Sequence, residues 1–160
     1  MQSFIPNAQD PRKFRDALGK YATGVCVITT DCPRGPLGIT ANSFVSVSLD
    51  PPMVLWCPAR FSRRYEAFTT CKSFAIHVLA QDQLELARHF TGDGLDFAPL
   101  KWSRGADDVP LLEGCLARFE CENYSVTEAG DHAVVIGQVI RAATREGAPL
   151  MFLDGRFQPG

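Results

Sequence analysis

The stretch GITANSFVSVSLDPP, residues 38–52, carries the clearest pattern in the sequence. In its second half two rows of side chains alternate: Phe44, Ser46 and Ser48 in one row, and Val45, Val47 and Leu49 in the other. A period of two places the rows on opposite faces of a strand, and the pair Pro51-Pro52 ends that strand. Residues 40–43, Thr-Ala-Asn-Ser, form a polar bend before it, which we call the elbow. The stretch therefore predicts two strands joined at the elbow, the first beginning near Leu37.

Extended segments and short helices follow on both sides of the elbow. Strands are expected at residues 25–30, 53–57, 74–79, 115–122, 133–140 and 149–153, which are rich in β-branched, aromatic or alternating apolar positions. Helices are expected at residues 11–20, 62–68 and 81–90, the first with Phe14, Leu18 and Tyr21 along one face. Residues 91–110, rich in Gly, Asp and Pro, predict a surface excursion. Strands and helices do not alternate, so the expected fold class is mainly β: a predominantly antiparallel closed barrel with a few peripheral helices.

Length and composition predict one globular domain over residues 1–160. Hydrophobic residues make up 46% of the chain and charged residues 21%, which are ordinary values for a folded domain of this size. The formal net charge is -2 and no block of like charges is present, so nucleic-acid binding is not expected. The N-terminal MQSFIPNAQDPRKF lacks the features of a signal peptide, and no apolar run approaches the length of a membrane span. We therefore expect a cytoplasmic protein that does not enter a membrane.

The six cysteines, at positions 26, 32, 57, 71, 115 and 121, form no CxxC pair. Without a secretion signal or metal-ligand spacing, they are expected to be reduced thiols that behave as small apolar side chains. No metal site is predicted. The sequence also contains no phosphate-loop, dinucleotide-binding or nucleophile-elbow motif.

The elbow is the first candidate binding site. Thr40, Ala41, Asn42 and Ser43, followed by Ser46 and Ser48, combine small hydrogen-bonding side chains with an accessible backbone between two apolar strands. A planar heteroaromatic ligand needs such donors and acceptors around an otherwise apolar site. The alternative is a polar turn with an exposed row of serines, and composition alone does not decide between them.

The segment Ser62-Arg63-Arg64 is the second candidate. It lies at an expected helix start, where free backbone N–H groups and guanidinium donors can hold a phosphate. The alternative is a pair of solvated arginines.

The three histidines differ in their surroundings. His77 lies inside an apolar strand and His89 at a helix end, where each has an ordinary structural explanation. His132 lies in the turn Gly130-Asp131-His132, directly before an expected central strand, and can point into a pocket from there. A solvent-facing turn histidine is the alternative.

These segments together resemble a known family. The resemblance is carried by residues 14–25, 38–44, 47–52, 73–79, 130–132, 136–139, 149–150 and 155–157, and is close to end to end. The chain resembles the short-chain flavin reductases, FMN-binding split-barrel proteins that serve as reductase components of two-component monooxygenases. The elbow with SLDPP and the turn GDH are together its most specific parts.

The resemblance implies a homodimer with FMN, or FAD, bound near the subunit interface. The flavin ring would lie against the elbow and the phosphate near the serines and near Ser62 and Arg63. His132 would lie close to the flavin and nicotinamide rings, and His77 and Phe157 would belong to the contacts around the flavin edge. The implied reaction is hydride transfer from NAD(P)H to a diffusible flavin, which then reaches an oxygenase component. This agrees with the absence of an acid–base motif, because the flavin itself carries the electron chemistry.

Two other functions stay open from the sequence. One is a flavoprotein that reduces another acceptor, such as a corrinoid or an iron centre. The other is a non-catalytic flavin-binding module, since one fold hosts many functions.

Overall fold

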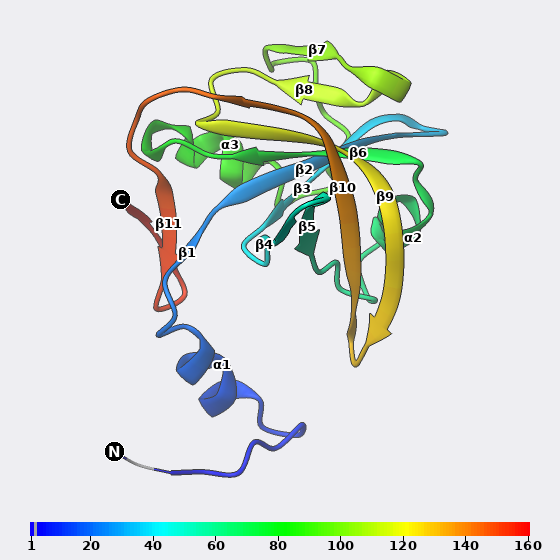
Figure 1. Cartoon of the computed structure of the whole chain (residues 1–160). Helices are drawn as coiled ribbons and strands as arrows, with labels where there is room; N and C mark the ends of the chain where they lie inside the picture. Colours follow the sequence, from blue (N-terminus) through cyan, green and yellow to red (C-terminus); the bar gives the residue numbers. More distant parts are fainter. Residues whose placement is uncertain (2) are drawn as a thin grey trace.

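The computed structural model describes Met1 and residues 3–160, and its centre is one seven-stranded antiparallel sheet (Figure 1). In sheet order its strands are β3 (Gly35–Ala41), β2 (Cys26–Cys32), β6 (Ser73–Val78), β9 (Ala117–Ala129), β10 (His132–Thr144), β5 (Pro52–Trp56) and β4 (Val45–Leu49). The sheet curls strongly, with β9 and β10 forming a long bent hairpin (Figure 1). The prediction of a mainly β, antiparallel fold with few helices is confirmed.

Smaller elements surround this sheet. A three-stranded sheet contains β1 (Thr23–Gly24), β11 (Leu150–Leu153) and β12 (Arg156–Pro159), and a two-stranded sheet contains β7 (Trp102–Arg104) and β8 (Pro110–Leu112). The helices are α1 (Arg12–Leu18), α2 (Tyr65–Thr70) and α3 (Leu84–His89), with short 3-10 turns η1 (Gln81–Gln83) and η2 (Ala106–Asp108). Within the described residues, no helix is long and apolar enough to cross a membrane.

The core lies on both sides of the β2–β6 pair. One cluster centres on Trp56, Phe68 and Phe74, with the Trp56 and Phe68 rings in an edge-to-face contact 5.1 Å apart. The other joins α3 to β11 through Phe90 and Leu150. The apolar side chains that alternate along the strands therefore pack into two clusters, one on each side of the sheet.

The expectation of a closed barrel is wrong in one respect. β3 and β4 are the two edges of the seven-stranded sheet, and in the described part of the chain no backbone ladder joins them. They are consecutive in sequence, so residues 42–44 cross the opening between them. The elbow therefore lies at the gap of an open, curled sheet.

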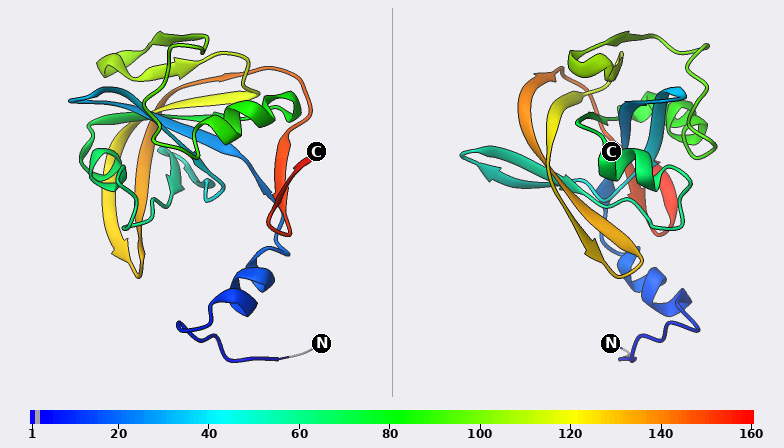
Figure 2. Two further views of the ribbon diagram at one scale, coloured as in Figure 1. Left: turned by 180° about the vertical axis from the view of Figure 1, so that it is seen from behind. Right: turned by 90° about the vertical axis from the view of Figure 1, so that its right-hand side faces the viewer.

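The N-terminal segment stands off the sheet as an arm (Figure 2). No residue of α1 is buried, and Leu18 and Tyr21 are 58% and 78% exposed. The arm is tied to the β11–β12 turn, because the Asp154 backbone N–H donates to the Gly19 carbonyl (2.8 Å) and Lys20 Nζ lies 2.8 Å from Asp154 Oδ1. The predicted apolar face of the first helix exists, but this chain does not cover it.

Most other expected elements are present, with two changes. Ser62 does not cap a helix: α2 begins at Tyr65, and the Ser62 hydroxyl accepts the N–H of Arg64 (3.2 Å) instead. The excursion at 91–110 is better packed than expected, since Phe97 is buried against Phe90 and Trp102. All six cysteines are free thiols, as predicted, although only Cys26 and Cys121 are fully buried.

Candidate functional site

The side chains of the elbow are held by hydrogen bonds to neighbouring elements. The Ser43 hydroxyl accepts the N–H of Cys57 (2.9 Å), at the end of β5. The Thr40 hydroxyl donates to the carbonyl of Ala87 in α3 (2.6 Å). The elbow therefore has a fixed shape, with β5 on one side and α3 on the other.

The outer edge of β3 is covered by the segment after α3. The Gly38 N–H donates to the Gly94 carbonyl (2.9 Å), and the Thr40 N–H to the Phe90 carbonyl (3.3 Å). The two segments can lie this close together only because residues 38 and 94 are both glycine. A Cβ on Gly38 would lie 2.3 Å from the Phe90 ring. A Cβ on Gly94, where φ is +80°, would lie 2.1 Å from the Gly38 carbonyl oxygen. These two glycines bring residues 90–94 against the strand that leads into the elbow.

A polar cleft of about 670 Å³ opens between this edge and residues 59–64. Arg34 and Arg63 line it, and neither forms an ion pair with any described residue. Arg64 also lines it, but its Nη1 donates to the carbonyls of Gly38 (3.0 Å) and Phe90 (2.9 Å). Burial lowers the pKa of the Arg64 guanidinium, and nearby Asp93 partly opposes that shift. We call this space the arginine cleft; its uncommitted cations suit an anionic group.

An apolar hollow of about 260 Å³ adjoins the arginine cleft, because Thr40 and Thr91 line both. Its other walls are Val25, Ala41, Asn42, Phe152 and Phe157. Phe152 and Phe157 face each other across the β11–β12 hairpin with ring centroids 5.4 Å apart. A flat apolar group fits beside these rings, with the elbow backbone at its edge.

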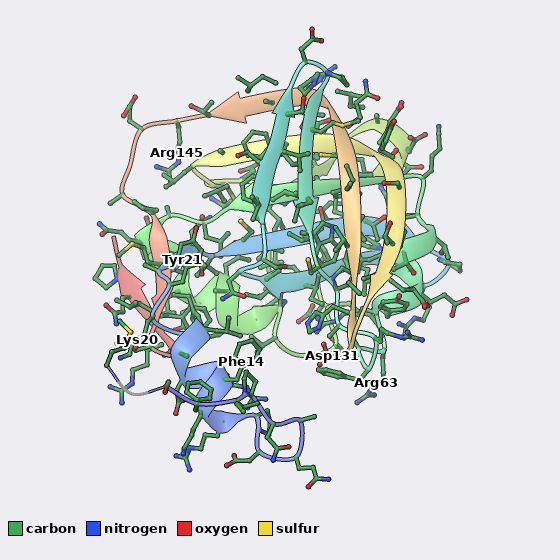
Figure 3. The ribbon with its side chains drawn as sticks, turned by 60° about the horizontal axis from the view of Figure 1, so that its bottom comes forward. Phe14, Lys20, Tyr21, Arg63, Asp131 and Arg145 are labelled. Atoms are coloured by element: carbon green, nitrogen blue, oxygen red, sulfur yellow. The ribbon has the colours of Figure 1, made fainter. Side chains whose placement is uncertain are left out.

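A third space, of about 860 Å³, continues from the hollow toward α1 and shares Asn42 and Phe152 with it. Tyr21 and Lys20 lie on its arm side, as Figure 3 shows for these two residues. The three spaces lie next to one another along the elbow, each sharing two lining residues with the next, and we call them together the groove.

His132 lies at the tip of the β9–β10 hairpin, next to the wall of the arginine cleft. Its backbone pairs with Ala59, and the Arg60 N–H donates to the Asp131 carbonyl (2.8 Å), so the tip is joined to the segment that carries Arg63 (Figure 3). His132 Nδ1 lies 2.7 Å from Asp131 Oδ1, and this contact lowers the pKa of the Asp131 carboxyl. The second ring nitrogen, Nε2, stays available to a ligand.

His77 does not belong to the groove, and the expectation that it contacts the flavin edge is wrong. Its side chain is fully buried. His77 Nδ1 lies 3.1 Å from the Val27 carbonyl oxygen, and Nε2 accepts the N–H of Leu112 (3.0 Å). Both ring nitrogens are therefore used in joining β2, β6 and β8, and burial lowers the pKa of His77 to about 4.

The other predicted residues divide into two groups. The groove brings together Thr40, Ala41, Asn42, Ser43, Ser62, Arg63 and Phe157. Ser46 and Ser48 lie on edge strand β4, where a bulge interrupts the register between them, and neither lines the groove.

The sequence interpretation missed Arg34, Thr91 and Phe152 as groove residues. Arg34 lies between two predicted strands, and Phe152 lies in the strand predicted at residues 149–153. No local pattern distinguishes them, since chain segments far apart in sequence bring them to the elbow.

A flavin nucleotide fits the chemistry of this groove. Its phosphate is anionic, its ring is large, flat and apolar on both faces, and its ring edge carries polar atoms. The arginine cleft, the apolar hollow and the elbow offer a matching set of groups side by side. The described residues contain no cluster of His, Cys, Asp or Glu that could hold a metal ion.

Comparison with known proteins gives a consistent result. Residues 18–160 match the family model described as the flavin reductase like domain. The chain is 50% identical over 154 residues to the FMN reductase (NADH) SmoA of Agrobacterium fabrum, covering 96% of this chain and 88% of that protein. It is 42% identical to the reductase component of the flavin-dependent trigonelline monooxygenase of Acinetobacter baylyi, covering 91% of this chain but only 48% of that protein.

Solved structures agree with the sequence relatives. The NADH:FAD oxidoreductase SgcE6 of Streptomyces globisporus is similar with a TM-score of 0.88 and 36% identity, over 98% of this chain and 96% of that one. The chain spans nearly the whole of some relatives and about half of others. It belongs to the flavin reductase-like family, as the resemblance of its elbow and GDH segments predicted.

Proposed function

We propose that the protein is an NADH-dependent flavin reductase that transfers a hydride from NADH to FMN and supplies reduced flavin to an oxygenase component. The observation that carries this proposal is the groove at the elbow, in which uncommitted arginines adjoin an apolar hollow, in a chain of this family. The names of its relatives support the same activity, and they include both FMN and FAD as flavins.

In this proposal the arginine cleft holds the flavin phosphate. Arg63 and Arg34 supply charge-assisted hydrogen bonds, and the Ser62 hydroxyl, whose oxygen already accepts the N–H of Arg64, still has a proton to donate. Ion pairs do not compete for either arginine within the described residues. Arg64 shapes the cleft and keeps β3 and residues 90–94 together.

The elbow and the Phe152–Phe157 pair orient the flavin ring. Ala41 and the two phenylalanines offer an apolar surface that excludes water, and Asn42 offers an amide to the polar edge of the ring. Bound flavin supplies the redox chemistry, so the chain has to position the two ligands rather than act as an obligatory acid or base. His132, held at Nδ1 by Asp131, presents Nε2 beside the cleft and polarises or orients the nicotinamide amide there.

We also propose that the protein is a homodimer. The arm exposes Phe14, Leu18 and Tyr21, and edge strand β4 exposes Val45, Val47 and Leu49, the last of which is 94% exposed. A monomer rarely leaves two such apolar rows uncovered. A second copy of the chain covers them, and the third space of the groove lies beside the same arm.

The remaining expectations complete the proposal. Residues 1–160 form one flavin reductase-like domain, supported by the family match over 18–160. A cytoplasmic location is supported by the six free thiols. The oxygenase partner is supported by relatives that are reductase components of monooxygenases.

Steady-state oxidation of NADH, with and without added FMN, tests the function. Saturable dependence of the rate on FMN, with NADH consumed and flavin reduced in equal amounts, is the expected result. A requirement for a different electron acceptor, or flavin binding without turnover, would replace it by one of the two other functions that the sequence leaves open.

A further inference from the structure

A separate hollow of about 320 Å³ is lined by residues of the β7–β8 segment and of β9 and β10. The β7–β8 pair lies at the top of the view in Figure 1. It shares no lining residue with the groove at the elbow. Gly105 and Leu111 form one wall, and Glu120 of β9 and Arg141 of β10 form the other. The proposed function uses none of these residues.

Glu120 is the unusual residue in this hollow. Its side chain is only 9% exposed, yet its closest charged partner is Arg118, whose Nε lies 3.4 Å from Oε1. The Arg118 Nε is itself buried and has no hydrogen-bond partner among the described residues. Buried ionic groups normally have hydrogen bonds that offset the cost of leaving water. The ion pair of Glu120 and Arg118 therefore lines the hollow, and among the described residues the buried Arg118 Nε lacks a hydrogen-bond partner.

Two further arginines stand at the hollow. Arg141 is opposite Glu120 in the β9–β10 register, is exposed, and makes no ion pair within the described residues. Arg104 is already shared between Asp31 (3.4 Å) and Asp108 (3.6 Å). The capacity to bind an anion therefore rests on Arg118 and Arg141.

The rest of the lining is apolar. Leu111 is buried on the inner wall, and Ile140 is 48% exposed at the mouth. Gly105 lies close to both the apolar wall and the carboxylate, since a Cβ there would lie 2.9 Å from Leu111 Cδ1 and 3.2 Å from Glu120 Oε2. The hollow thus offers a cationic corner, a carboxylate and an apolar wall within the volume of a small molecule.

We propose that this hollow binds a free α-amino acid with an apolar side chain. Its carboxylate would pair with Arg118 and Arg141, its ammonium group would donate to Glu120, and its side chain would lie on Leu111 and Ile140. A ligand with both charges pairs with Arg141 and Glu120 at the same time, whereas a ligand with one charge pairs with only one of them, so the site favours the amphoteric molecule. The inference does not depend on the flavin reductase activity.

Ligand-observed NMR titration of the full-length protein tests this with three matched probes: L-phenylalanine, 3-phenylpropionate and 2-phenylethylamine. L-phenylalanine should show saturable binding at least tenfold tighter than either single-charge probe. Absence of saturable binding by L-phenylalanine, or equal affinity for all three probes, would overturn the proposal.

Variants locate the binding. Arg141→Gln should weaken L-phenylalanine binding at least tenfold, and Glu120→Gln should remove the preference over 3-phenylpropionate. Gly105→Ala keeps every charge but adds a methyl group beside Glu120 and should also weaken binding at least fivefold; it keeps the test valid if Glu120→Gln fails to fold. Arg12→Gln, which removes one charge from the exposed helix α1, should stay within twofold. Equal affinities across Arg141→Gln, Gly105→Ala and Arg12→Gln would place the ligand elsewhere and refute the assignment.

Discussion

Arg64 donates a hydrogen bond to the backbone carbonyl of Gly38 (3.0 Å), the strand residue on which the ring of Phe90 packs. Its neighbour Arg63 makes no such contact in the described structure and lines the arginine cleft. Two adjacent arginines therefore have different tasks, one in the fold and one in the proposed binding of a phosphate.

Replacement of Arg64 should cost stability. Arg64→Met keeps most of the aliphatic stem but removes two charge-assisted hydrogen bonds, so the free energy of unfolding should fall by about 2 to 3 kcal/mol. Urea unfolding monitored by Trp fluorescence measures this. Arg63→Met is the matched control and should change stability by less than about 0.5 kcal/mol. Equal losses in the two variants would contradict the division of tasks.

The double variant Ser62→Ala/Arg63→Ala should weaken FMN binding more than riboflavin binding, because riboflavin lacks the phosphate. The expected loss for FMN is roughly 1.5 to 3 kcal/mol, the range for well-made charge-assisted contacts. Fluorescence titration with both flavins measures it. If riboflavin loses as much affinity as FMN, the phosphate is bound elsewhere.

His132→Ala should lower kcat/KM for NADH by roughly tenfold to a hundredfold, about 1.4 to 2.7 kcal/mol of transition-state stabilisation. FMN affinity should change less. Asp131→Asn, which leaves the ring but removes the carboxylate that holds Nδ1, should give a smaller loss. Stopped-flow reduction of flavin-loaded protein is the measurement, and a His132→Ala rate within twofold of the unmutated protein would remove His132 from the site.

The homodimer can be tested by multi-angle light scattering at micromolar concentration, where a mass of twice 17.6 kDa is expected. Leu49→Glu should shift the protein toward monomer, because this exposed side chain contributes little to the folded monomer but would place a charge in the interface. Glu85→Gln on α3, away from both apolar rows, should leave the mass unchanged. A monomer for the unmutated protein would exclude the dimer.

His77 should make the protein sensitive to acid. Its pKa is about 4 in the folded chain against an ordinary value of 6.5, so the unfolded chain takes up the proton first as the pH falls. The stabilisation is complete above pH 6.5 and is lost as the pH falls toward 4, with about 2 kcal/mol lost at pH 5. Urea unfolding at pH 7.5 and 5 measures the loss, and an NMR titration that gave His77 a pKa above 6 would rule out this cause.

The strands of the sheet could be predicted wherever one face is buried. The β9–β10 hairpin shows the limit of that reasoning: the alternation that predicts the first strand covers residues 115–122, whereas β9 runs to Ala129. Its outer half has both faces largely exposed, so no apolar alternation marks it, and the pairing with β10 alone maintains the strand.

The candidate site shows the same limit. The elbow and the GDH turn were found because they are continuous in sequence. The burial of His77 depends on Leu112, 35 residues further along, and the role of Arg64 depends on Phe90. The local pattern already indicates a structural role for His77, and only the family resemblance assigns it to the flavin edge. The contacts that distinguish Arg64 from Arg63 exist only after the chain has folded, so residue type and local pattern could not separate these two arginines.

The two edge strands of the seven-stranded sheet differ in whether their outer backbone groups are covered. Residues 90–94 and Arg64 occupy the outer backbone groups of β3, whereas β4 has no such cover in the described chain. A sheet whose two edge strands are both free can pair with further chains at each edge without limit. With one edge of this sheet already occupied, a second copy that pairs at β4 leaves no equivalent edge for a third. Association at β4 therefore ends in a closed pair and does not continue into a filament.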